Sequence, residues 1–226
     1  MRRLSAICLM LLLLAAGLFA EDGAVAMRFK LLEAEFYTLD SYYSSELGRL
    51  YTKAEFAIPK AELDPMAYYG FFLEENTFIQ SVTVSGQFEN HYFVQNLDPS
   101  FFEPALPDSS LLYDTSPVRF YGIYLKNYDL FPDTPHFTVW YFTPMPAFRL
   151  DDQQKLSSML KADQCWYPRN FTKSSTVNLT LTTTPNLTLL VGNSYATHSD
   201  SEYTRTHRHT FIDTLEQPVD IKLIRE

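Results

Sequence analysis

The sequence predicts a mainly β protein, an antiparallel β-sandwich with one helix near its N-terminus. Short apolar segments separated by Pro, Gly, Asn and Asp clusters favour antiparallel strands over βαβ units. Aromatic residues make up 15% of the chain and charged residues 20%, which supplies ample material for a hydrophobic core. Val177, Leu179 and Leu181 alternate with polar neighbours, the period-two pattern of a half-buried strand.

Residues 1–20 have the composition of an export signal peptide. Arg2 and Arg3 precede the apolar run 7–14, and cleavage is expected after Ala20 or as late as Ala26. The run is too short to predict a membrane span, so we expect a secreted or periplasmic protein without a stable membrane anchor. Loss of the two arginines changes the formal charge from −9 to −11, which argues against nucleic acids and anionic membranes as partners.

Residues 27–50 are predicted to form the N-terminal helical segment. Seven apolar residues recur there at spacings of three and four, and Gly48 is the expected stop. They are Phe29, Leu32, Phe36, Leu39, Tyr43, Leu47 and Leu50. The alternative is that part of the segment is a strand, because it is rich in aromatic residues, which favour strands.

Residues 51–226 are expected to form one β-domain. Its predicted strands are 51–58, 66–73, 78–85, 91–94, 118–125, 137–142, 176–183, 187–191, 203–212 and 219–224. Leu156, Met159 and Leu160 are spaced as in one short helix within 151–164. Cys165 is the one cysteine left after signal removal, and a buried position beside Trp166 is favoured over a reactive thiol.

His207 and His209 are the most specific candidate for a metal site in the sequence. Residues i and i+2 of a strand face the same side, so both imidazoles could meet one metal ion, with His198 as a third ligand. The favoured interpretation is a pH-sensitive surface pair, because the threonines around them are typical of a solvated strand face. We therefore predict neither a metal site nor another cofactor.

Three Asn-x-Thr sequons begin at Asn170, Asn178 and Asn186. In a eukaryotic secretory route they would be candidate glycosylation sites. The alternative is that they arise by chance in a region rich in Asn and Thr.

The order of features along the chain resembles a known family. Trp166-Tyr167-Pro168 forms an aromatic-proline corner, followed by the strands 177–182 and 187–191 and the turn at Gly192. Upstream, 54–59 and 71–86 are similar to the family's opening strands, and 118–125 and 137–141 to its middle. Together they resemble the N-terminal β-domain of aminopeptidase N-type zinc metallopeptidases (gluzincins). The resemblance covers roughly 50–226 and implies an elongated, saddle-like antiparallel domain.

The resemblance does not extend to catalysis. Family members hold zinc in a separate helical domain through His-Glu-x-x-His and a distant Glu, and this sequence contains no such motif. The chain ends at Glu226, where that domain would begin. No catalytic residue is predicted, and the expected function is that of a binding or interaction module with a protein or peptide partner.

Two alternatives stay open. The chain could be the accessory domain of a split or truncated zinc aminopeptidase, paired with a separate catalytic domain. It could also be a carbohydrate- or peptide-binding sandwich, with Trp140, Tyr141, Trp166 and Tyr167 as stacking residues, although core packing is the favoured role of these four. An exposed row of aromatic residues on one sheet face would favour a sugar-binding role.

Overall fold

The computed structural model describes residues 28–226 except 95–97, 107, 113–115, 126–127 and 215–218. The predicted signal peptide therefore lies outside the described residues. Within the described part of the chain, no helix has the length and apolar character to cross a membrane.

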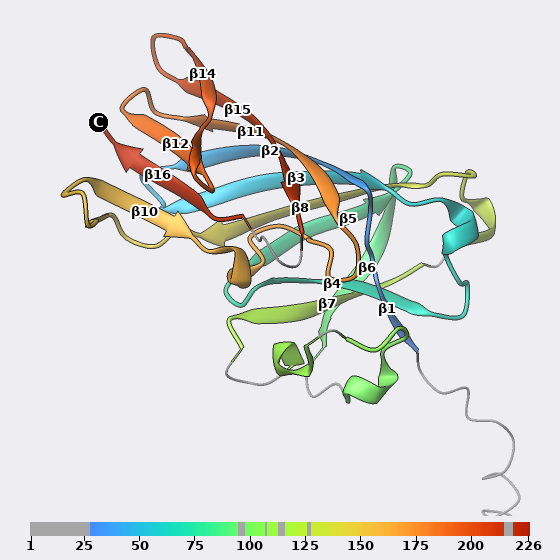
Figure 1. Ribbon diagram of the computed structural model, residues 1–226. Coiled ribbons are helices and arrows are strands. Elements are labelled where there is room, and N and C mark those ends of the chain that lie inside the picture. Colours follow the sequence, from blue (N-terminus) through green and yellow to red (C-terminus); the bar gives the residue numbers. More distant parts are fainter. Residues whose placement is uncertain (1–27, 95–97, 107, 113–115, 126–127, 215–218) are drawn as a thin grey trace, which may run out of the picture.

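The larger of two sheets contains eleven strands, and most neighbours are antiparallel (Figure 1). Two neighbouring pairs, β1 with β4 and β2 with β11, are parallel. In spatial order the strands are β1 (Phe29–Leu31), β4 (Tyr68–Glu74), β7 (Val118–Tyr124), β6 (Gln87–Val94), β5 (Phe78–Val84), β8 (His136–Pro144), β3 (Arg49–Ala57), β2 (Phe36–Ser44), β11 (Ser175–Thr183), β15 (Arg205–Asp213) and β14 (Thr197–Asp200).

The smaller sheet has five antiparallel strands. Their order is β13 (Ser194–Tyr195), β12 (Leu187–Val191), β16 (Ile221–Arg225), β10 (Leu156–Leu160) and β9 (Arg149–Leu150). Short 3-10 turns connect the strands: η1 (Lys60–Glu62), η2 (Pro99–Phe101), η3 (Ser109–Leu112), η4 (Tyr128–Leu130) and η5 (Ala162–Gln164).

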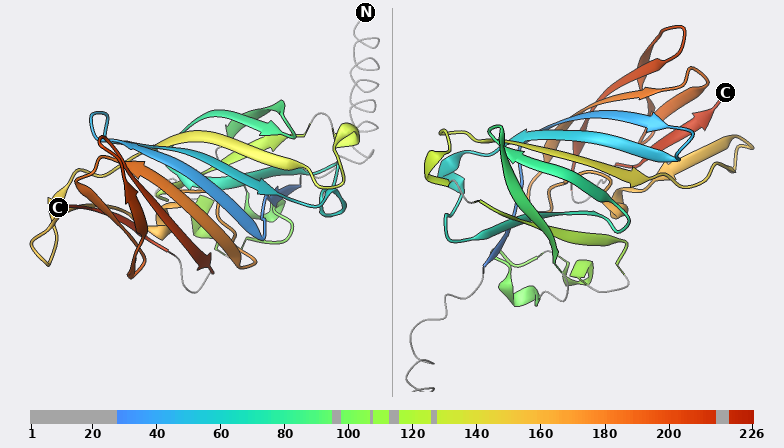
Figure 2. Two further views of the ribbon diagram at one scale, coloured as in Figure 1. Left: turned by 90° about the horizontal axis from the view of Figure 1, so that it is seen from above. Right: turned by 180° about the vertical axis from the view of Figure 1, so that it is seen from behind.

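The large sheet is curved. The smaller sheet lies beside the end that contains β11, β15 and β14 (Figures 1 and 2). β1, β4 and β7 turn away at the other end of the molecule (Figure 1). Along β3, every second residue is buried, so one face packs on the core and the other faces solvent. The main core joins the inner face of the large sheet to Leu189 and Leu223 of the smaller one. The mainly β prediction is confirmed.

The predicted helix over 27–50 is wrong, and the strand alternative holds for most of this segment. It contains β1, β2 and the start of β3, and Gly48, at φ +59°, lies in the turn between the last two. Along β2, Tyr37 and Leu39 face the core while Phe36 is exposed. The helical spacing combined residues from both faces of a strand, and aromatic preference together with pairing to β3 and β11 decided the outcome.

The short helix expected within 151–164 is also wrong, because Leu156–Leu160 forms strand β10. β10 pairs with β16, about sixty residues later in the chain, through Ser157↔Ile224 and Leu160↔Ile221. The pairing with β16 outweighs the weak helical spacing of Leu156, Met159 and Leu160. The ten strands predicted after residue 50 are all present, with ends shifted by a few residues.

Candidate functional site

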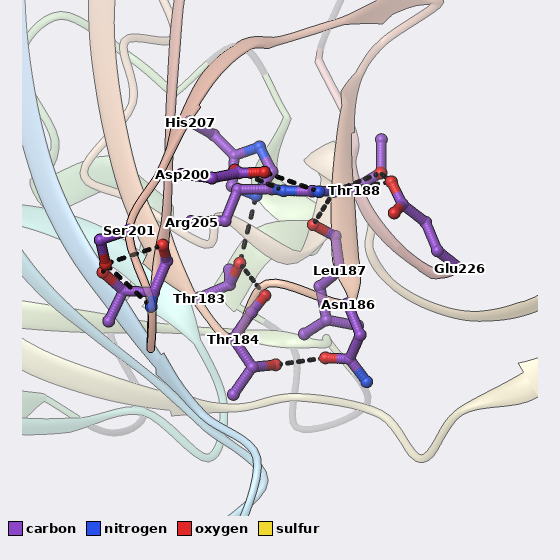
Figure 3. Close-up of polar contacts among 11 residues, drawn as sticks. Thr183, Thr184, Asn186, Leu187, Thr188, Asp200, Ser201, Arg205, His207 and Glu226 are labelled. Atoms are coloured by element: carbon purple, nitrogen blue, oxygen red, sulfur yellow. Dashed lines mark hydrogen bonds and ion pairs between the residues drawn. The ribbon is translucent and has the colours of Figure 1, made fainter.

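β15 carries the predicted histidine pair and alternates between the core and solvent. His207 is fully buried, and its Nε2 shares a hydrogen bond of 3.1 Å with Thr183 Oγ1 on β11 (Figure 3). His209 is half-buried on the same side of β15, and its ring lies 6.5 Å from that of Phe211. The expectation of a surface pair is wrong for His207, because the inner face of β15 packs against the smaller sheet.

His198 lies opposite His207 on β14, with the two ring centroids 6.0 Å apart. The three histidines do not form a metal site together. Among the residues that the structure describes, no group of three or more His, Cys, Asp or Glu side chains is arranged to hold a metal ion. Burial, followed by the positive charge of Arg205 and then by His198, lowers the pKa of His207 to about 4.

Arg205 is the centre of the polar cluster beside His207 (Figure 3). Its Nε donates to Asp200 Oδ1 at 2.8 Å, its Nη2 to Asp200 Oδ2 at 3.1 Å and its Nη1 to Glu226 Oε1 at 2.6 Å. The hydrogen bonds from Arg205 lower the pKa of the Asp200 carboxyl group. Hydrogen bonds from Thr188 and then from Arg205 lower the pKa of the Glu226 carboxyl group. The cluster ties the β14–β15 hairpin to the last strand, which is a structural role because each group already has a partner.

Three of the four aromatic candidates lie in the core. Trp166 donates from Nε1 to Val219 O at 3.1 Å, and Tyr141 donates to Trp166 O at 3.1 Å. Tyr167 donates its hydroxyl proton to buried Asp213. Trp140 differs, because 44% of its surface is exposed on the outer face of β8. The four residues therefore do not form one exposed surface, and core packing is the role of the other three.

The three sequons lie in different environments. Asn170 is buried, accepts a hydrogen bond from Tyr37 at 2.7 Å and donates one to Ala34 O at 2.7 Å. Its amide is therefore inaccessible to a modifying enzyme in the folded protein. Asn178 faces outward from β11 as predicted, and Asn186 is exposed in the turn after that strand.

A partly exposed aromatic row crosses the outer face of the large sheet, built from residues that the sequence prediction did not group. Tyr42 of β2 pairs with Tyr51 of β3, Tyr51 pairs with Phe142 of β8, and Phe142 pairs with Phe78 of β5. The ring centroids of Tyr51 and Phe142 are 5.5 Å apart, and those of Phe142 and Phe78 are 5.3 Å apart. Trp140 lies on β8 two residues before Phe142 and faces the same side of the sheet. The alternation within each strand marks these positions as outward, but the row depends on the register between four strands.

A groove of about 320 Å³ lies on this outer face and includes part of the row. Its lining includes the aromatic residues Tyr42, Tyr51 and Trp140 and the polar residues Asp40, Lys53, Gln80 and Thr182. Gln80 is exposed on β5, at the point where the register between β5 and β8 shifts. Lys53 Nζ lies 5.6 Å from the centroid of the Trp140 ring and 2.7 Å from Glu55 Oε1.

Comparison with known proteins identifies the class of fold. No family model matches the sequence, and no curated protein matches it. Solved structures of M1 zinc metallopeptidases do match, and the matched region is their N-terminal part. The chain therefore has the fold of the N-terminal domain of these enzymes, as the resemblance in its sequence predicted.

Two similar structures illustrate the extent of the match. An M1 zinc metallopeptidase from Deinococcus radiodurans shares 10% identity at a TM-score of 0.54, over 84% of this chain and 42% of that one. Native leukotriene A4 hydrolase from Saccharomyces cerevisiae shares 11% identity at a TM-score of 0.53, over 85% of this chain and 29% of that one. The protein thus spans less than half the length of either enzyme.

Proposed function

We propose that this protein is an exported, non-catalytic accessory domain that binds a zinc-peptidase catalytic domain. The observation that supports the proposal is the fold, which corresponds over 84% of the chain to the N-terminal part of M1 zinc metallopeptidases. The sequence lacks the His-Glu-x-x-His motif that binds zinc in gluzincins. The zinc chemistry would then be supplied by the catalytic domain.

In this role the large sheet acts as a rigid scaffold. Backbone hydrogen bonds and the core that joins the two sheets fix the relative positions of their strands. A partner domain that packs on such a scaffold is held in one orientation, which limits the shapes of peptide that reach its active site. The protein would affect catalysis through the partner's substrate entrance.

The first experiment measures hydrolysis of aminoacyl p-nitroanilides by the purified mature protein, with total metal analysis and with and without added zinc. We expect no turnover and substoichiometric metal. Zinc-dependent turnover that survives repeated purification would contradict the proposal and would make His207 and His209 the first residues to replace.

The second experiment tests the partner directly. The tagged protein is isolated from its native source at natural abundance, and the bound fraction is assayed for zinc and for anilide hydrolysis. We expect a stoichiometric complex that contains zinc and hydrolyses the substrates. A protein recovered alone, or with partners that have neither zinc nor peptidase activity, would overturn the accessory role.

A further inference from the structure

We propose that the groove on the outer face of the large sheet binds an extended, neutral oligosaccharide. The site goes beyond the accessory role above, because it uses a face that carries its own aromatic and polar groups. The inference is based on the shape of the groove, the exposure of its aromatic rings and the charges of its lining.

The shape of the groove suits a chain rather than a compact small molecule. Its lining extends from Thr182 on β11, across β2, β3 and β8, to Gln80 on β5. Neighbouring strands are about 4.8 Å apart, so the groove crosses roughly 19 Å of the sheet. A volume of about 320 Å³ over that length describes a shallow, elongated trough.

The exposed aromatic rings provide apolar surfaces for the C–H faces of pyranose rings. Tyr42 is 51% exposed and Trp140 is 44% exposed, although both belong to long strands in the middle of the sheet. Exposed large apolar groups that cluster on one face are informative, because a solvated sheet face is normally polar. Contact between such a ring and a sugar removes apolar surface from water, which favours binding.

The polar groups of the lining are suited to sugar hydroxyls. The central strands use their backbone N–H and C=O groups within the sheet, so a ligand on this face can bond only to side chains. The side chains of Asp40, Gln80 and Thr182 offer a carboxylate, an amide and a hydroxyl group beside the rings. This mixture differs from the mainly apolar centre of a stable protein interface.

The charges of the lining favour a neutral ligand. Asp40 and Lys53 are its two charged residues; they lie opposite one another in the register of β2 and β3, and Lys53 forms its ion pair with Glu55. Asp40 and the Lys53–Glu55 pair leave no excess of positive charge, so the groove gives no attraction for an acidic polymer. The hydroxyl groups of a neutral glycan can donate hydrogen bonds to the Asp40 carboxylate.

The two tryptophans make a direct binding assay possible. Trp140 lines the groove, whereas Trp166 is fully buried in the core. The purified mature protein is titrated with cellohexaose, chitohexaose and maltohexaose while tryptophan fluorescence is recorded. We expect a saturable change with at least one of the three, and no change in Trp140→Phe, which retains Trp166 as an internal reference.

Calorimetry with the hexaose that binds then locates the site. We expect Trp140→Ala and Tyr42→Ala each to weaken binding about tenfold. Tyr203→Ala removes an exposed ring outside the groove and is expected to bind like the unaltered protein. Circular dichroism checks that all three variants are folded.

Three results would overturn the inference. The first is failure of all three hexaoses to bind, and the second is equal binding by Trp140→Ala and the unaltered protein. The third is self-association in sedimentation that both groove substitutions abolish, because the face would then be an interface between copies of the chain. None of these results depends on peptidase activity, so the site and the accessory role fail separately.

Discussion

At the scale of single residues, His207 shows how burial changes the chemistry of a side chain. Its imidazole lies between Thr183 and the Arg205 cluster, with Asp200 on β14 and Glu226 after β16 close by (Figure 3). Burial is the main reason that its pKa is lowered to about 4, and Arg205 and His198 add to the effect. The folded protein therefore holds this histidine neutral at pH values where an exposed histidine is half protonated.

We expect His207 to make stability depend on pH between about 6.5 and 4. The unfolded chain binds a proton as the pH falls through about 6.5, whereas the folded protein binds it only near 4. The contribution is thus present above pH 6.5 and is lost progressively as the pH falls to about 4, to a total of about 3 kcal/mol. Urea unfolding at closely spaced pH values measures this loss.

The variant His207→Gln is the control for this prediction. It keeps a polar side chain near Thr183 but has no proton to bind, so its stability should vary less over the same pH range. His136→Gln, at an exposed position of β8, should retain the full dependence. If His207→Gln and the unaltered protein lose stability in parallel, the attribution to His207 is wrong.

At the scale of the strands, Gly70 is a position where close packing against the neighbouring strand leaves no room for a side chain. Gly70 of β4 lies opposite Gly122 of β7. A Cβ atom added at Gly70 would lie 2.3 Å from Phe120 Cζ and 2.4 Å from the backbone oxygen of Tyr121. The aromatic ring could move, but the carbonyl belongs to a paired strand and cannot move without breaking its ladder.

We expect Gly70→Ala to destabilise the fold by about 3 kcal/mol, because overpacking forces the β4–β7 pair apart. Thermal and urea unfolding measure the change. Gly48→Asn is the matched control, because that glycine has a positive φ that Asn tolerates and no atom lies within 4 Å of an added Cβ. Its effect should stay below about 1 kcal/mol, and equal losses in the two variants would contradict the packing argument.

At the scale of the whole molecule, a buried ion pair joins Arg169, which follows the Trp166-Tyr167-Pro168 corner, to Asp213 at the end of β15. Arg169 Nη2 donates to Asp213 Oδ1 at 3.2 Å and to Thr214 O at 3.1 Å, and Nη1 donates to Ala162 O at 3.4 Å. Tyr167 donates to the other carboxylate oxygen. Burial raises the pKa of Asp213, while Tyr167 and Arg169 lower it in part. The pair thus links β15 in the large sheet to η5 beside the smaller one.

Removal of one partner should be more harmful than loss of the pair. Arg169→Met leaves the Asp213 carboxylate buried without its counter-ion, and we expect a loss of about 3–5 kcal/mol. In Arg169→Met/Asp213→Leu no charge remains, so the loss should be smaller than the sum of the single variants by about 1–3 kcal/mol. Urea unfolding of all four proteins gives the coupling, and strict additivity would show that the pair acts as two independent residues.

Most of the strands can be predicted from the local sequence pattern. Along β11, for example, the apolar residues Val177, Leu179 and Leu181 alternate with polar ones, which indicates that one face of the strand is buried. Pattern was insufficient for β2, where apolar residues on both faces imitate a helical stripe. It was also insufficient for the groove, because Tyr42 and Trp140 become neighbours only through the pairing of β2, β3 and β8. Register between strands depends on contacts distant in sequence, which no local window contains.

The sequence by itself determined the mainly β class, the order of ten strands after residue 50 and the resemblance to the N-terminal domain of zinc metallopeptidases. These properties depend on side-chain alternation and on turn residues, which act over a few positions of the chain. Only the tertiary structure decided that His207 is buried, that Trp140 is exposed and that aromatic residues form a row across one face. Each of these depends on which strands are neighbours and which face meets the second sheet, and packing across the whole chain determines both.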